Sequence, residues 1–184
     1  MTVSAGRPKH AEQMPAPVTL DFEGVYRAEL SYVMHTLRRL GVAHTDLEDV
    51  AHDVFVAVHR HFDDYDAGRP LRPWLFAFAY RIARDHRKLA RHRLEVHEPV
   101  DEPAGEMPLP DEALDDERLR RMLLAVLDAL DFEKRSIIVM HDIDGMPVPE
   151  IAKLLEVPLN TAYSRLRLAR AAFERELERL RRTP

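Results

Sequence analysis

The chain has 184 residues, of which 27 are lysine or arginine and 32 are aspartate or glutamate, and its formal net charge is -5. It contains no cysteine, which excludes disulfides and cysteine-based zinc sites and suits a reducing compartment. There is no run of about 18 apolar residues that could cross a membrane, and residues 1–18 lack the apolar core of a signal peptide. We therefore expect a cytoplasmic protein in which residues 1–18 form a disordered extension.

The charges are sorted along the chain. Residues 19–66 hold ten acids and four bases, residues 67–93 hold eight bases and one acid, and residues 94–117 hold ten acids and no base. Residues 157–184 are basic again, with a net charge of +4. Two basic blocks on either side of an acidic one indicate two surfaces that face a polyanion, although a charge run is more often only a solvated face.

Three amphipathic helices are predicted in residues 19–93. The first begins after Asp21, a good helix cap, and ends at Gly41. The second follows a predicted capping box of Thr45 and Glu48, and the third begins near Pro73 after a loop rich in glycine and proline. The apolar stripe of the second helix is the clearest of the three and consists of Leu47, Val50, Ala51, Val54, Phe55 and Val58.

Residues 94–116 have the composition of a linker. They contain four prolines, many acids and no apolar periodicity, so they cannot bury a core. They divide the chain into a unit at residues 19–93 and a unit at residues 117–184. No segment alternates apolar and polar residues as a strand would. The predicted fold is all-α, with two small helical domains joined by an acidic, proline-rich linker.

The second unit ends in a predicted helix-turn-helix. A short helix at residues 150–155 and a turn containing Val157 precede a long helix. On the long helix the predicted buried stripe is Ala162, Leu166, Ala169, Phe173, Leu177 and Leu180, and the opposite face carries Asn160, Ser164 and Arg167. Asparagine and arginine pair bidentately with adenine and guanine edges, which favours DNA binding. The alternative is an amphipathic helix with a solvated arginine face.

These motifs resemble those of the sigma-70-type transcription initiation factors. "GMPVPEIAKLLEVPLNTAYSRLRLAR" resembles the region 4 helix-turn-helix of that family, and "DLEDVAHDVFVAVHRHFDDYD" and "RPWLFAFAYRIARDHRKLARH" resemble its region 2. The likeness covers about residues 20–93 and 118–180, in the order of the family. Because only regions 2 and 4 find room in the chain, it is similar to the small extracytoplasmic-function (ECF) group.

The resemblance implies a function and its partners. The implied partners are promoter DNA and bacterial core RNA polymerase, the latter through its beta-prime clamp helices and beta flap, and an anti-sigma factor is a further candidate. Region 2 would recognise and melt the −10 element, and region 4 would bind the −35 element. The acidic linker would run through the polymerase toward the RNA exit channel. The relative orientation of the two domains is left open.

The resemblance also assigns candidate residues to each surface. Those facing core polymerase are Asp46, Asp49, His52, Asp53 and Val56. Those facing the −10 element are Arg69, Arg72, Trp74, Tyr80, Arg81, Arg84 and Lys88, in which basic groups alternate with aromatic platforms for unstacked bases. Those facing the −35 element are Pro158, Asn160, Thr161, Tyr163, Ser164, Arg165, Arg167, Leu168 and Arg170. An alternative of equal weight is that Trp74 anchors the hydrophobic core of its domain.

Several positions depart from the family pattern. His52 stands in place of glutamine, Tyr163 in place of lysine or arginine, and Glu156 in place of the turn glycine. Glu156 is therefore predicted to take a positive φ at some energetic cost. The changes on the long helix of the predicted helix-turn-helix leave open which promoter sequence it would read. They leave the fold prediction unchanged.

Two other classes of function are alternatives. Neighbours such as His52-Asp53 and His141-Asp142 could suggest a metallohydrolase, but adjacent residues on a helix point about 100° apart. We expect no metal, no cofactor and no enzymatic activity. A non-sigma regulator would also use a helix-turn-helix, but it would leave the region 2 likeness unexplained.

Overall fold

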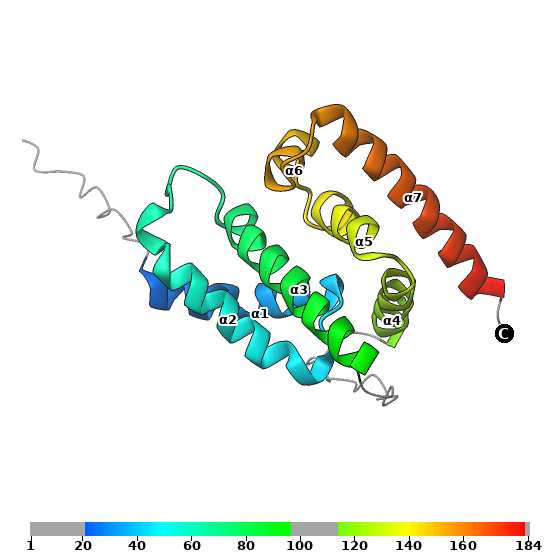
Figure 1. The fold of residues 1–184 in the computed structure, drawn as a ribbon, viewed down its shortest axis with the longest axis horizontal. Helices are drawn as coiled ribbons and strands as arrows, with labels where there is room; N and C mark the ends of the chain where they lie inside the picture. Colours follow the sequence, from blue (N-terminus) through cyan, green and yellow to red (C-terminus); the bar gives the residue numbers. More distant parts are fainter. Residues whose placement is uncertain (1–20, 97–113, 183–184) are drawn as a thin grey trace, which may run out of the picture.

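The computed structural model describes residues 21–96 and 114–182, which form two helical domains (Figure 1). The predicted extension at residues 1–18 and residues 97–113 of the predicted linker at residues 94–116 lie outside the described residues. Residues 94–96 form the end of α3 and residues 114–116 the start of α4. The first domain contains α1 (Phe22–Leu40), α2 (Leu47–Arg60) and α3 (Leu71–Val96). The second contains α4 (Leu114–Asp128), α5 (Phe132–Ile138), α6 (Val148–Leu154) and α7 (Leu159–Arg182). The two described ranges hold no strand, as predicted for an all-α fold.

Helix α1 begins and ends where the sequence predicts. The Asp21 side chain accepts a hydrogen bond from the backbone N–H of Gly24 at 2.7 Å, which satisfies one of the free donors at the helix start. At the other end Gly41 has φ 89°, and the N–H groups of Gly41 and Val42 bond to the carbonyls of Arg38 and Leu37. This is the Schellman arrangement, in which a residue with a left-handed backbone closes the helix.

The start of α2 differs from the prediction. Residues His44–Asp46 form a short 3-10 helix, and α2 begins at Leu47 with no side-chain cap. The hydroxyl of Thr45 donates to the carboxylate of Asp46 at 3.0 Å, so the predicted Thr45 and Glu48 capping box is wrong. The apolar stripe from Leu47 to Val58 is buried as predicted. Helix α3 also begins at Leu71, two residues ahead of Pro73.

The second domain is built around α7. This helix packs against α4, α5 and α6, and it buries Ala162, Leu166, Ala169 and Ala172. Phe173, Leu177 and Leu180, also predicted for the stripe, are half-buried. Helix α5 continues into a π-helical turn, Val139–Ile143, which leads to α6.

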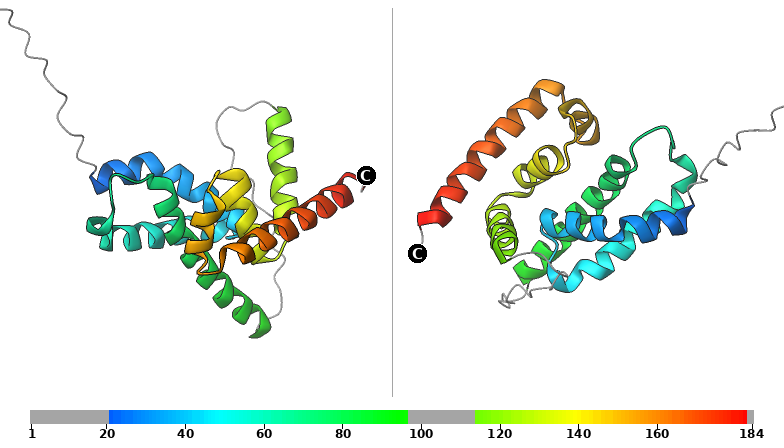
Figure 2. Two further views of the ribbon diagram at one scale, coloured as in Figure 1. Left: turned by 90° about the horizontal axis from the view of Figure 1, so that it is seen from above. Right: turned by 180° about the vertical axis from the view of Figure 1, so that it is seen from behind.

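The two domains pack against each other. Helix α5 contacts both α7 and α1, so it lies between α7, the helix predicted to read DNA, and the first domain (Figures 1 and 2). The buried apolar side chains of both domains form one continuous core.

Candidate nucleic-acid interface

The face of α7 predicted to read DNA points into solvent. Leu166 and Ala169 anchor the helix on the inner side. The exposed candidates are Pro158, Asn160, Tyr163, Ser164, Arg167, Leu168 and Arg170, whereas Thr161 and Arg165 are half-buried. Tyr163 and Leu168 are 52% and 53% exposed, which is high for large hydrophobic side chains. The predicted inner and outer faces of this helix are therefore confirmed, and its role toward DNA remains a prediction.

The turn before α7 depends on a strained residue. Glu156 has φ 55°, as predicted from its place in the turn. Its N–H bonds to the carbonyl of Lys153 at 3.2 Å, and the N–H of Val157 bonds to that of Ala152 at 3.0 Å. These are the two bonds of a Schellman motif, so Glu156 at the end of α6 occupies the position that Gly41 holds at the end of α1.

One reading-face arginine is paired within its own domain. Arg170 binds both carboxylate oxygens of Asp142, and its Nε lies 3.1 Å from Oδ2. This hydrogen bonding raises the pKa of Arg170 above its ordinary value. Arg165 also approaches Glu133 at 3.7 Å. The geometry holds the Arg170 guanidinium at one side of the reading face.

The basic residues around the start of α3 form a second polar surface with acidic neighbours. Arg69 lies 3.3 Å from Asp66 and Arg72 lies 3.0 Å from Glu29. The Arg72 guanidinium also sits 4.9 Å from the centre of the Tyr32 ring. Further along the helix, Arg81 and Lys88 are exposed.

Trp74 packs within an aromatic cluster. Its ring centre lies 4.9 Å from that of Tyr65, 5.0 Å from Phe78 and 6.5 Å from Phe62. The side chain is half-buried. The cluster fastens the loop before α3 to the domain while leaving part of the indole accessible.

Tyr80 is the one −10 candidate that the structure buries, with 9% of its surface exposed. Its ring stacks on Phe132 of the second domain at 5.5 Å with an interplanar angle of 22°. The Arg84 guanidinium lies 5.8 Å from the centre of the same ring. Burial raises the pKa of the Tyr80 hydroxyl.

The candidates for polymerase contact lie along α2. Asp49, His52 and Asp53 are exposed, whereas Asp46 and Val56 are half-buried. Asp46 is 3.1 Å from Nε2 of His86 on α3. Asp49, His52, Asp53 and Val56 share one side of α2, and Asp46 lies in the 3-10 helix just before it.

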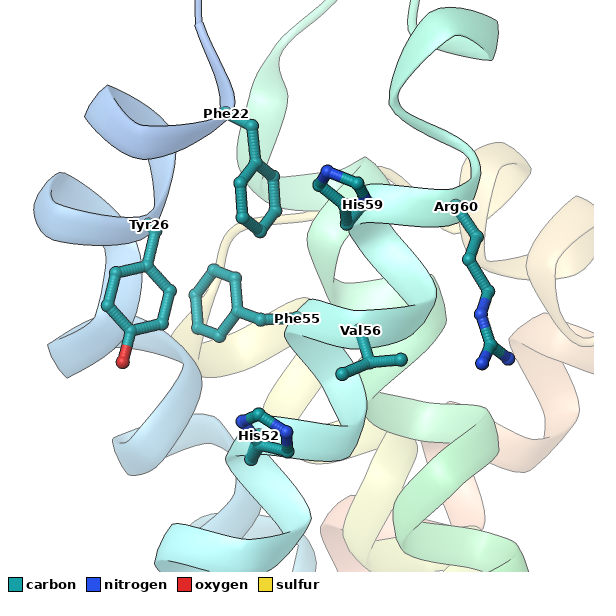
Figure 3. Close-up of a pocket in the computed structure, with 7 residues that line it drawn as sticks. All are labelled: Phe22, Tyr26, His52, Phe55, Val56, His59 and Arg60. Atoms are coloured by element: carbon teal, nitrogen blue, oxygen red, sulfur yellow. The ribbon is translucent and has the colours of Figure 1, made fainter.

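Beside them an apolar groove of about 390 Å³ runs between α1 and α2 (Figure 3). Phe22 and Tyr26 from α1 face Phe55 and His59 from α2, and the rings of Phe22 and His59 are 4.7 Å apart at nearly a right angle. His52 and Val56 also line the groove. Two of the five predicted polymerase-facing residues thus border an apolar depression suited to a helix or an aromatic side chain.

Sequence reasoning did not identify the residues that join the domains. Arg135 on α5 is 1% exposed and donates to the backbone carbonyls of Arg38 and Arg39 at the end of α1. The Tyr32 hydroxyl on α1 donates to Asp144 at 2.7 Å. The sequence shows Arg135 only as one of three adjacent charged residues in a short helix, and its partners on α1 lie about a hundred residues away in the chain.

Burial has opposite electrostatic consequences at this contact. It lowers the pKa of Arg135, while the charge of Asp128 works against that change. It raises the pKa of Asp144, against hydrogen bonding from Tyr32 and the charge of Arg39. Burial and the Asp144 charge together raise the pKa of Tyr32, which keeps its hydroxyl as a hydrogen-bond donor.

Residues 21–96 and 114–182 contain no group of three or more histidine, aspartate or glutamate side chains placed to hold a metal ion. In the same two ranges, no helix is both long and apolar enough to span a membrane.

The fold and the exposed α7 face define a two-domain helical protein with a C-terminal helix-turn-helix. Family models agree with both halves: residues 25–93 match sigma-70 region 2 and residues 120–173 match sigma-70 region 4. The chain belongs to the sigma-70 family of RNA polymerase sigma factors, within its ECF group. The first domain is therefore region 2 and the second is region 4.

Several named sigma factors are similar to this chain in sequence. The chain is 31% identical over 152 residues to the RNA polymerase sigma factor CnrH of Cupriavidus metallidurans, covering 77% of this chain and 78% of that one. It is 31% identical to NccH of Alcaligenes xylosoxydans xylosoxydans over 138 residues, covering 73% and 74% of the two chains. It is 26% identical to the ECF sigma-E factor of Escherichia coli over 145 residues, covering 73% and 75%.

Two solved structures share the fold. CnrH in complex with the cytosolic domain of CnrY matches with a TM-score of 0.59 at 29% identity, covering 85% of this chain and 87% of that one. RpoE of Bartonella quintana, solved with the anti-sigma factor NepR, matches with a TM-score of 0.69 at 21% identity, covering 86% and 97%.

Proposed function

We propose that this chain binds core RNA polymerase and directs it to specific promoters, with region 2 recognising and melting the −10 element and region 4 binding the −35 element. The observation that carries the proposal is the outer face of α7. It presents Asn160, Ser164 and Arg167 to solvent on a helix anchored by buried alanine and leucine. Such side chains pair with base edges in the major groove. The proposed function would place the chain in the cytoplasm, and it assigns no enzymatic reaction to it.

The proposal divides the work between two surfaces of region 2. The exposed side of α2 and its neighbouring groove would meet the clamp helices of core polymerase. The exposed Arg81 and Lys88 on α3 would follow the DNA backbone near the −10 element. Region 4 would also contact the beta flap. An anti-sigma factor is a further proposed partner, because RpoE, which shares this fold, was solved with the anti-sigma factor NepR.

Run-off transcription with bacterial core polymerase on a pooled promoter library tests the proposal. Specific start sites that depend on this chain are expected. Active polymerase that yields no specific initiation with it would refute the function.

Within that assay Arg167→Ala tests the reading face. Loss of one bidentate base contact should cost about 1 to 3 kcal/mol of discrimination at one base pair. Arg181→Ala is the matched control, because it removes the same charge from the same helix about 21 Å further along. Equal losses of core binding and −35 selectivity in the Arg167 variant would contradict the assignment of faces.

A further inference from the structure

The reading face of α7 has an apolar side chain at each of its two edges. The reading face is the outer side of this helix, where Asn160, Ser164 and Arg167 point into solvent. Successive residues of a helix are rotated by about 100°, so Tyr163 and Leu168 each lie about 70° from the centre of this polar stripe, on opposite sides of it. Helix α7 lies at the outer edge of the second domain (Figure 1), so both edges of the face are open to a partner.

The protein leaves both of these large side chains outside its core. Tyr163 is 52% exposed and Leu168 is 53% exposed. Among the described residues, the core cluster and the half-buried apolar side chains packed against it include neither of them. Single exposed apolar side chains are common on protein surfaces. The informative feature is therefore the placement of these two on either side of one polar stripe.

Tyr163 also differs from the other four of the five tyrosines in the chain. Within residues 21–96 and 114–182, Tyr163 forms no hydrogen bond and no ring contact. Its ring and hydroxyl are therefore available to a ligand of the reading face. Each of the other tyrosines meets a partner in the protein through its ring or its hydroxyl: Tyr26 meets Phe55, Tyr32 meets Asp144, Tyr65 meets the Arg69 carbonyl and Tyr80 meets Phe132.

The major groove of DNA offers such side chains one kind of apolar partner. The groove is about 12 Å wide and admits an α-helix, and the C5-methyl group of thymine is the apolar group that base pairs present there. A helix that turns its polar stripe toward the middle of the groove directs its two edges toward the two strands. Because each thymine methyl lies toward the backbone of its own strand, Tyr163 and Leu168 face thymines on opposite strands.

The separation of the two side chains along the helix sets the spacing of those thymines. Tyr163 and Leu168 are five residues apart, which corresponds to a rise of about 7.5 Å along an α-helix. Base pairs of DNA follow one another every 3.4 Å or so along the axis, about half of that rise. For a helix that follows the groove, the two contacts are therefore about two base pairs apart.

We propose that Tyr163 and Leu168 read the methyl groups of two thymines, one on each strand and about two base pairs apart, within the −35 element. This inference rests on the proposed function and deepens it, because it names bases that region 4 selects. Asn160 and Arg167 supply hydrogen bonds to the base edges between the two methyl groups. The apolar edges of the face distinguish thymine from cytosine, whose edge carries no methyl group.

Uracil tests the proposal directly, because it pairs as thymine does and lacks only the methyl group. The holoenzyme is assembled from the full-length chain and core polymerase, and the run-off selection supplies its preferred −35 sequence. Each thymine of that sequence is then replaced singly by deoxyuridine in duplex promoter DNA. Binding should weaken about fourfold at each of the two predicted positions, the factor expected for one buried methylene-sized group. Binding should be unchanged at other thymines.

Variants assign each methyl group to its side chain. In Leu168→Ala the loss caused by uracil at one position should disappear while the loss at the other position remains, and Tyr163→Ala should show the reverse. Leu168→Met and Tyr163→Phe should keep both losses, because each retains the apolar contact. Leu119→Ala is the matched control, because it makes the same substitution at a leucine that is 59% exposed on α4, and it should also keep both losses. All of these side chains are largely exposed, so each variant should melt at the temperature of the parent.

Specific promoter binding that is indifferent to every uracil would refute the proposal and leave the proposed function standing. A selected −35 sequence without thymines on opposite strands at this spacing would refute it in the same way. Uracil losses that persist in both alanine variants would show that other groups sense the methyl groups, which also overturns it. If Tyr163→Phe lost as much binding as Tyr163→Ala, the hydroxyl would be the contact and the role of the ring would be wrong. If the holoenzyme selects no promoter, the proposed function fails, and this inference fails with it.

Discussion

Replacing Glu156 with glycine should stabilise the protein, although it removes a side chain. Glu156 closes α6 with φ 55°, a conformation that costs an L-residue roughly 1 to 2 kcal/mol. Glycine avoids this cost but loses roughly 0.5 to 1 kcal/mol through the greater freedom of the unfolded chain. The two hydrogen bonds of the motif use backbone atoms alone and remain. The net gain expected for Glu156→Gly is about 0.5 to 1 kcal/mol.

Urea unfolding followed by circular dichroism measures this gain, and a melting temperature higher by about 1 to 4 °C should accompany it. Gly145→Ala is the reverse control. Gly145 has φ 69° and an added Cβ would meet no atom within 4 Å, so any loss of stability reports backbone strain alone. Unchanged or lower stability of Glu156→Gly, together with a neutral Gly145→Ala, would refute the strain argument.

Three carboxylates give further predictions. Asp142→Asn should release Arg170 and so strengthen non-specific DNA binding. The slope of log binding constant against log salt concentration should become steeper by about one unit. An equal change in Glu178→Gln, at the far end of α7, would contradict this. Asp131→Ala removes the cap of α5 and should cost about 1 kcal/mol at pH 7. Burial alone would raise the pKa of Asp131, but its hydrogen bonds outweigh burial and lower it. The stability that Asp131 contributes should therefore be lost as pH falls through this lowered pKa, which urea unfolding at several pH values measures. Burial raises the pKa of Asp144, so the stability that this group contributes is present at low pH and is lost as pH rises. The stability of Asp144→Asn relative to the parent should therefore increase between pH 4 and pH 7. A difference in stability that stays constant over this range would refute the argument.

The helices could be predicted because their determinants are local. The stripe on α2 and the inner face of α7 repeat every three or four residues, and Asp21 and Gly41 mark helix ends by their own chemistry. The positive φ of Glu156 was predicted only because this residue stands where the family pattern has a turn glycine. The prediction of a capping box at the start of α2 was wrong because two short polar side chains, next to each other there, bond to each other instead. Thr45 bonds to its neighbour Asp46 in a 3-10 turn, and the sequence pattern does not distinguish that bond from a capping box.

The surroundings of the candidate site were not predictable in the same way. The sequence groups Arg72 and Tyr80 as one basic and aromatic surface, but the structure pairs Arg72 with Glu29 and stacks Tyr80 on Phe132. The hydrogen bonds that Arg135 and Tyr32 make between the domains join residues 96 to 112 positions apart. No period or motif encodes such a pair, because it depends on how two already formed helical units meet.

The π-helical turn Val139–Ile143 sends two neighbouring carboxylates in different directions. Asp142 binds Arg170 on the reading helix, whereas Asp144, just beyond the turn, binds Tyr32 on region 2. In a helix each residue is rotated by a fixed angle from the last, so both directions depend on the number of residues in this segment. Substitutions here would alter one contact at a time, but a single insertion or deletion would misdirect both. We therefore expect the length of this segment to vary less among homologues than its sequence does.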